Sequence, residues 1–304
     1  MLGVAVNRST FSFPVGKVDI KTMYPMDIEE FMIAMGNKDL TEMIRKSFES
    51  NAPMPAALHD ICMQLYRQYL VVGGMPECVS LFAQTKDYVL VRHNQDTILA
   101  SYLNDMSKYN NLNEIKKTRL AYDNITVQLS KKNTRFQYKL IKKGGRASEF
   151  ENAIEWLNLS GIVSQVYKAE QIKKPLENYR DIDSFKIYVS DSGLLCAKKS
   201  LSANDILYMV DEINEFKGGM TENYVNVQLT INGHKTYYWE SDRVAEIDFI
   251  GFYGGKAVPL LFQQFEVAFR QCVFPFGFWM PHVNPAVINL SLIHISEPTR
   301  RVVI

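Results

Sequence analysis

The sequence lacks the patterns that mark several common classes of functional site. Its 304 residues contain no GxxxxGK[ST] and no GxGxxG, so neither a P-loop nor a dinucleotide-binding turn is expected. The five histidines form no HExxH motif, and no Gly-x-Ser-x-Gly marks a hydrolase nucleophile. The four cysteines include no CxxC pair, which favours reduced, buried thiols over a disulfide framework or a zinc site. We therefore expect no catalytic residue and no bound cofactor in this chain.

The sequence also lacks an excess of charge and a membrane-spanning segment. Its 34 basic and 33 acidic residues leave a formal net charge of +1, so any attraction to nucleic acid needs a local patch. One charge-free run, over 271–296, is interrupted by three prolines and predicts no transmembrane helix. The first residues do not resemble a signal peptide. These features predict a cytoplasmic protein without a membrane partner.

Apolar residues recur at helical spacing between 28 and 110. Ile28, Phe31 and Met32 predict a first helix, which has acidic residues in its first turn. Further helices are expected over 58–69, ending at Gly73-Gly74-Met75-Pro76, and over 89–106. The pattern predicts a small all-helical domain.

Residues 111–174 follow the order helix, helix, helix, strand. Phe150, Ala153, Ile154 and Leu157 lie at i, i+3, i+4 and i+7 and predict the last of these helices. A strand is expected directly afterwards, over 162–167. Three helices closed by a short β element are typical of a winged helix.

Strands and a helix alternate over 175–259. Strands are expected over 185–189, 235–240 and 245–252, with a helix over 221–229 between the first two. A turn at Gly254-Gly255-Lys256 predicts one more strand. The expected fold class is therefore a multidomain α+β protein whose third part is a small α/β domain.

A basic stretch lies within the expected winged helix, between its first and its last helix. Seven cations fall within sixteen residues that include no acid: Lys131, Lys132, Arg135, Lys139, Lys142, Lys143 and Arg146. Such a loop on a winged helix could follow a DNA backbone. The next helix carries Glu149, Glu151 and Glu155, which would be repelled by phosphates in a major groove. Two interpretations stay open: nucleic-acid contact through the loop, and a solvated or domain-docking face.

Acidic residues on an expected strand and on the helix before it suggest an incomplete metal site. Glu246 and Asp248 share one face of an expected strand, and Glu222 lies on the preceding helix. In a nuclease site, acids hold Mg²⁺ and the lysine of a Glu-x-Lys on the next strand orients the attacking water. No lysine follows Lys256 in this sequence. We expect Glu222 and Asp248 to be the metal ligands of a site that lacks its lysine.

Many motifs, in order, resemble prokaryotic AAA-type ATPases that carry a C-terminal domain of unknown function. The resemblance rests on Phe13-Pro14-Val15-Gly16, Met23-Tyr24-Pro25-Met26-Asp27, Gly73-Gly74-Met75-Pro76-Glu77, Gly145-Arg146-Ala147-Ser148-Glu149-Phe150, Phe185-Lys186-Ile187-Tyr188-Val189-Ser190-Asp191 and Thr221-Glu222-Asn223-Tyr224. It implies a helical lid, a winged helix and a restriction-endonuclease-like domain, preceded by an ATPase core with Walker motifs. ATP and Mg are implied for that full-length parent, and whether this chain is itself an enzyme is left open.

The resemblance also implies domain boundaries. The expected units are a remnant of the ATPase core over 1–27, the lid over 28–110, the winged helix over 111–174 and a truncated endonuclease-like domain over 175–259. Residues 260–304 are expected to be a non-native tail, because the composition changes near Leu260. Within it, Leu290 to Arg300 resembles a translated sequencing adapter.

The leading hypothesis is the C-terminal portion of an AAA-type ATP-binding protein that has no ATPase activity of its own and contacts DNA through the winged helix. One alternative is a non-enzymatic protein-interaction module. Another is a truncated, metal-dependent DNA nuclease. The expected partners are DNA and the missing ATPase core.

Overall fold

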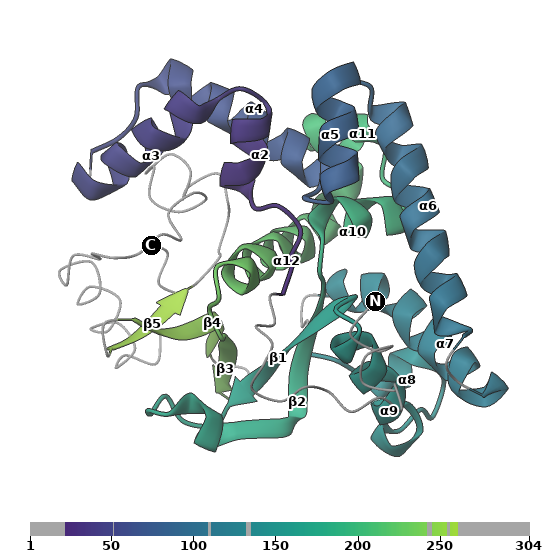
Figure 1. Ribbon diagram of the computed structural model, residues 1–304. Helices are drawn as coiled ribbons and strands as arrows, with labels where there is room; N and C mark the ends of the chain where they lie inside the picture. Colours follow the sequence, from purple (N-terminus) through teal and green to yellow (C-terminus); the bar gives the residue numbers. More distant parts are fainter. Residues whose placement is uncertain are drawn as a thin grey trace, which may run out of the picture.

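The computed structural model describes residues 22–50, 52–108, 111–131, 135–241, 245–253 and 256–260, with backbone alone at 245, 252, 253 and 256–260. Over this part of the chain the protein is a mixed α/β structure in which helices predominate around a five-stranded sheet (Figure 1). No helix within these ranges is long and apolar enough to cross a membrane. Most of the expected ATPase remnant and the expected foreign tail lie outside the described residues.

Five helices form the first group, and several begin at residues suited to a helix start. Asp27 caps the first of them and exchanges side-chain-to-backbone hydrogen bonds with Glu30, and Asp87 caps the last. Pro76 is the first residue of α5, where an N–H would have no intrahelical partner. The three expected helices are confirmed, and two more lie between them. The group consists of α2 (Ile28–Ala34), α3 (Lys38–Ser50), α4 (Ala56–Val72), α5 (Pro76–Thr85) and α6 (Tyr88–Met106).

The second group contains three helices and an antiparallel strand pair. Its elements are α7 (Leu112–Leu129), α8 (Tyr138–Ile141), α9 (Ala147–Leu159), β1 (Val163–Ala169), η1 (Leu176–Tyr179) and β2 (Arg180–Val189). Val163 lies opposite Val189 in the β1–β2 pair. Between α7 and α8, Arg135 forms an antiparallel bridge with Lys186 of β2, and the Phe136 N–H donates to the Phe185 carbonyl at 2.8 Å. This segment covers part of the outer edge of β2.

The third group completes the sheet. It consists of α10 (Ser192–Lys198), α11 (Ala203–Leu207), η2 (Asp211–Ile213), α12 (Asn214–Ile231), β3 (Tyr237–Ser241), β4 (Ala245–Tyr253) and β5 (Lys256–Leu260). The strand order is β2-β1-β3-β4-β5, with β1 and β3 parallel and the other neighbours antiparallel. The expected strand after the Gly254-Gly255 turn is confirmed as β5. β1 therefore joins the second and third groups into one sheet, and α12 packs against β2.

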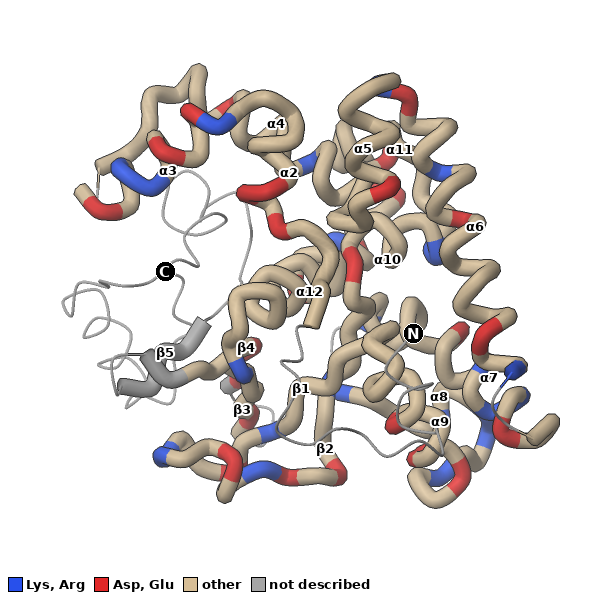
Figure 2. Tube along the Cα trace, viewed as in Figure 1, with Lys and Arg blue, Asp and Glu red and all other residues tan. Residues whose placement is uncertain are grey.

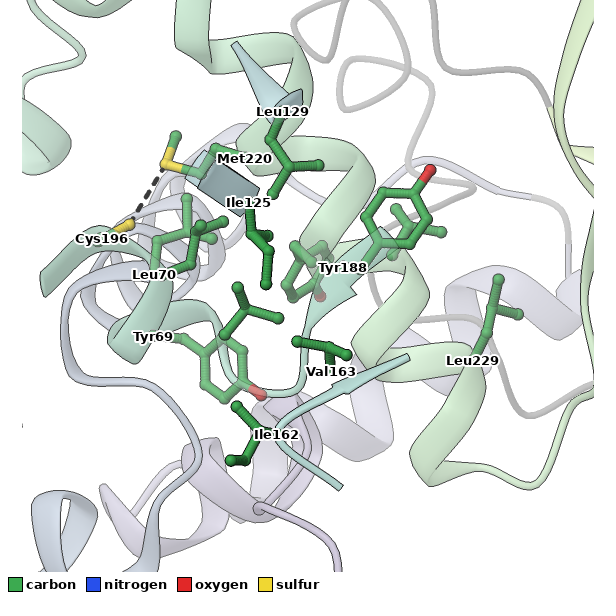
Figure 3. Close-up of a cluster of buried hydrophobic side chains, with 14 of the residues drawn as sticks. Tyr69, Leu70, Ile125, Leu129, Ile162, Val163, Tyr188, Cys196, Met220 and Leu229 are labelled. Atoms are coloured by element: carbon green, nitrogen blue, oxygen red, sulfur yellow. Dashed lines mark hydrogen bonds between the residues drawn. The ribbon is translucent and has the colours of Figure 1, made fainter. Parts of the chain in front are cut away.

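One hydrophobic core connects the three groups. Tyr69 of α4 and Tyr224 of α12 meet edge to face with ring centroids 5.9 Å apart, and Ile125 of α7 lies in the same cluster (Figure 3). Buried aromatic rings in this geometry stabilise a core beyond their area alone. The cysteines of the described part are buried, as expected: Cys62, Cys78 and Cys196. Cys272 lies outside the described residues.

A buried carboxylate fastens the α4–α5 turn to α10. Asp191 caps α10 by accepting from the Leu194 N–H at 2.8 Å and also accepts from the Gly74 N–H at 2.6 Å. Burial raises the pKa of Asp191, and these backbone donors oppose that rise. Gly193 is required at this junction because a Cβ there would overlap the Gly73 backbone. The end of β2 is thereby fixed to the helical group, which sets the position of the side chains on β2.

Candidate functional site

β2 buries a lysine in the middle of an apolar run. Lys186 lies between Phe185 and Ile187, and its side chain is 0% exposed. Since alternate residues of a strand face the same side, Lys186 and Tyr188 project from one face of the sheet. An ammonium group removed from water needs opposite charge and hydrogen-bond acceptors nearby. The neighbours of this nitrogen therefore define a candidate site.

Three carboxylates from two other elements meet at the Lys186 ammonium. Its Nζ lies 3.4 Å from Glu222 Oε2 on α12, 2.8 Å from Glu246 Oε1 on β4 and 3.4 Å from Asp248 Oδ1 on β4. The Tyr188 hydroxyl donates to Glu222 Oε2 at 3.0 Å. The side chains of Glu222 and Asp248 are 17% and 16% exposed, whereas that of Glu246 is 41% exposed. We call Lys186, Glu222, Glu246 and Asp248 the Lys186 cluster.

The cluster carries more negative than positive charge. Burial acts to lower the pKa of Lys186, but the surrounding acidic groups, Tyr188 and the three carboxylates, outweigh burial and hold this pKa well above its usual range. Burial is also the main cause of the raised pKa of Glu222, with Lys186 opposing it and Asp248 adding to it. The ammonium is therefore charged at neutral pH, and Glu222 takes up a proton at a higher pH than an exposed glutamate.

Glu222 and Asp248, the expected metal ligands, thus lie beside each other around an ammonium group. Lysine supplies positive charge and three donors at the point where carboxylates would otherwise gather around a cation. Among the residues that the structure describes, no group of three or more His, Cys, Asp or Glu is arranged to hold a metal ion. The side chains of β5 are outside the described part, and its sequence, Lys256 to Leu260, contains no Glu-x-Lys.

The sequence-based prediction of this site missed Lys186. One signal for it was present, since a single cation within an otherwise apolar strand segment must reach either solvent or a carboxylate. Glu246 was visible on the same strand face as Asp248, but nothing local to the sequence linked either acid to a lysine on β2. The distance between these residues along the chain explains why.

One cation of the basic stretch, Arg135, is tied to the sheet. Arg135 Nη1 lies 3.7 Å from Glu240 Oε1 on β3, and Lys168 of β1 lies 3.3 Å from the same oxygen. Next to Arg135, the Phe136 ring stacks on Phe185 with centroids 5.1 Å apart. This part of the stretch therefore contributes to the packing of the sheet edge.

Amide side chains of α7 hold the backbone of the same stretch. The Gln128 side chain accepts from the Gln137 N–H at 3.1 Å and donates to the Gln137 carbonyl at 3.0 Å. Asn124 donates to the Leu140 carbonyl at 2.8 Å. These bonds hold the backbone at both ends of α8 against α7, so this part of the loop has a defined conformation.

The remaining cations of the stretch face solvent. Lys139, Lys143 and Arg146 are exposed and have no ion-pair partner among the described residues, and Lys131 is exposed as well. Lys142 is 3.0 Å from Glu149 on α9. Lys132 was also predicted to contact nucleic acid, and it lies outside the described residues. We call Lys131 to Arg146 the basic loop.

Comparisons with known proteins identify one matching family model. Residues 63–205 match a family described as a domain of unknown function, DUF8612. The match covers just under half of the chain. The matched region runs from within α4 to within α11 and contains the basic loop and Lys186. A search of curated proteins and a search of solved structures each return no significant match.

Proposed function

We propose that this chain is the DNA-contacting C-terminal part of an AAA-type ATPase and that it has no ATPase activity of its own. The observation that carries the proposal is the exposed basic loop on the unit formed by α7, α8, α9, β1 and β2. Three helices closed by an antiparallel strand pair have the order of a winged helix, with residues 170–179 as the wing. An isolated antiparallel bridge between Arg135 and Lys186 also joins the segment between α7 and α8 to β2.

The chemistry of the loop favours the phosphate backbone as the group contacted. Lys139, Lys143 and Arg146 present charge and donors to solvent, and each phosphate they contact would release condensed counterions. The aromatic residue Phe136 is buried against Phe185, so it is not available to stack on bases. Contact of this kind depends on salt and carries little sequence preference.

The ATPase part of the proposal rests on the ordered motifs shared with that family. The helices α2 to α6 would be its lid, and the sequence carries no P-loop through which this chain would bind ATP itself. ATP and Mg would belong to the intact parent, and the ATPase core would be the natural partner of the lid.

A second function is favoured by a separate observation. Three carboxylates lie within 3.4 Å of one nitrogen in the Lys186 cluster, and these acids would be the ligands of a metal-dependent nuclease only if the ammonium moved out from between them. A divalent cation would have to displace the Lys186 ammonium from between the carboxylates. The Lys186 side chain would then lie beside the cation and could orient a water molecule. Mg²⁺-dependent cleavage of DNA that disappears in both Glu222→Gln and Asp248→Asn would support this function. If the chain neither binds nor cleaves DNA, the non-enzymatic docking module is the account that fits.

The proposed DNA contact is tested with the full chain. Binding to a short fluorescent DNA duplex is measured at low salt for the wild type and for a loop variant, Lys139→Gln/Lys143→Gln. A control variant, Lys38→Gln/Lys46→Gln, removes the same charge from exposed positions on α3. The loop variant should bind more weakly than the control variant. Absence of wild-type binding at low salt would overturn the proposal.

A further inference from the structure

A cavity of about 470 Å³ separates the start of α7 from the end of the basic loop. This volume lies within the range of about 300–1,000 Å³ that ligand sites occupy. Its α7 wall includes Asn113, Lys116 and Lys117, and its opposite wall includes Lys142 and Glu149. We call it the α7 groove. The groove brings Lys116 and Lys117 of α7 close to Lys142, which lies in the second half of the basic loop.

The charge of the groove is positive, although two glutamates line it. Lys117 is 2.9 Å from Glu114, and Lys142 is 3.0 Å from Glu149, so each glutamate already has a lysine partner. Lys116 is exposed and has no ion-pair partner among the described residues. Figure 2 shows Lys and Arg positions on α7 and on the neighbouring segment around α8 and α9. Cations from α7 therefore extend the positive surface of the basic loop.

The outer face of α9 offers phosphates no comparable surface. Glu151 and Glu155 are exposed there, and two carboxylates on a helix would repel a DNA backbone. A duplex approaching the basic loop is attracted on the side of the α7 groove and repelled on the side of α9. This asymmetry favours the side of the α7 groove for a bound backbone.

We infer that the α7 groove binds the phosphodiester backbone of duplex DNA. The inference rests on the proposed DNA contact and adds Lys116 and Lys117, two residues that the basic loop does not include. A phosphate would replace Glu149 at Lys142 and accept hydrogen bonds from the two α7 lysines. That exchange is easy because the Lys142–Glu149 pair is 60% and 33% exposed, and such exposed pairs contribute little to stability.

The test compares three double variants of the full chain. The groove variant is Lys116→Gln/Lys117→Gln, and it is measured beside the loop variant and the α3 control variant, which remove the same charge. Affinity for the fluorescent duplex is followed between about 50 and 200 mM salt. The slope of log K against log salt changes by about 0.9 for each phosphate contact. Loss of two contacts should flatten the slope by about 1.8, so the fall in affinity across this range becomes about 12-fold smaller.

The outcomes separate the groove from the proposed function. A flattened slope in both the groove and loop variants, with the control variant like the wild type, supports the groove. If the loop variant weakens binding but the groove variant matches the control, the groove is overturned and the proposed DNA contact stands. If the wild type does not bind at low salt, the proposed function is overturned and the groove with it. Circular dichroism checks that every variant is folded.

Discussion

Replacing Lys186 with methionine removes the ammonium around which Glu222, Glu246 and Asp248 gather. Methionine keeps a long apolar stem, so the change removes charge with little loss of packing. The three carboxylates would then lose the ammonium that lies between them, and removing one partner of a buried ion pair costs about 3–5 kcal/mol. Because Glu246 is 41% exposed, water screens part of this charge. We therefore expect a loss in the free energy of unfolding at the lower end, about 3 kcal/mol.

The expected loss depends on pH. Lys186 opposes the rise that burial causes in the pKa of Glu222, so without the ammonium Glu222 binds its proton more tightly in the folded than in the unfolded state, and stability rises as pH falls. The loss should be larger near about pH 8 than near about pH 5. In the wild type, the raised pKa of Lys186 affects stability in a more alkaline pH range. Its contribution is complete below the ordinary lysine pKa of about 10.4 and disappears as pH rises through the raised value.

Urea unfolding followed by circular dichroism measures this effect. The control is Lys235→Met, which breaks the pair between Lys235 and Glu177. That pair is shorter at 2.7 Å, but its side chains are 67% and 60% exposed. We expect the control to unfold with the wild type, because solvent screens such a pair. The reasoning is refuted if Lys186→Met unfolds at the same urea concentration as Lys235→Met.

Further predictions concern stability and use the same urea assay. Glu222→Gln should cost less than the lysine substitution, because it relieves excess negative charge and keeps an acceptor for Tyr188; a larger loss would contradict the raised pKa of Glu222. Gly218→Ala should stabilise α12 by up to about 1 kcal/mol, since no atom lies near the added Cβ. The adjacent Gly219→Ala should destabilise the protein by about 1–3 kcal/mol, because its added Cβ would overlap the Leu129 carbonyl. Equal effects at the two glycines would count against this packing. Asp191→Ala should cost about 1–3 kcal/mol for each backbone donor that it leaves unpaired, whereas an effect below 1 kcal/mol would show that these bonds are replaced.

Those parts of the fold that depend on local patterns were predictable. The apolar residues of α4 and α9 recur at helical spacing, those of β4 alternate, and a turn before β5 predicted that strand. α10 was not predicted, because its residues from Ser192 to Ala197 are all buried and show no polar face. A short helix without amphipathic spacing depends on the core around it, and its sequence resembles a turn.

The candidate site could be predicted in part for the same reason. The basic loop is a local feature of the sequence, and its exposed cations lie where that pattern suggests. The Lys186 cluster depends on contacts between residues 36 to 62 positions apart, made by a strand, a helix and a more distant strand. No local spacing encodes such contacts. Likewise, nothing in the sequence places Lys116 opposite Lys142 across one groove.

The measurement that tests the proposed DNA contact most directly is the salt dependence of duplex binding by the full chain. The triple variant Lys139→Gln/Lys143→Gln/Arg146→Gln removes three exposed cations of the basic loop. If each contacts a phosphate, the slope of log K against log salt should be flatter than that of the wild type by about 2.7. Identical slopes for the wild type and the triple variant would contradict the proposal that this loop contacts DNA.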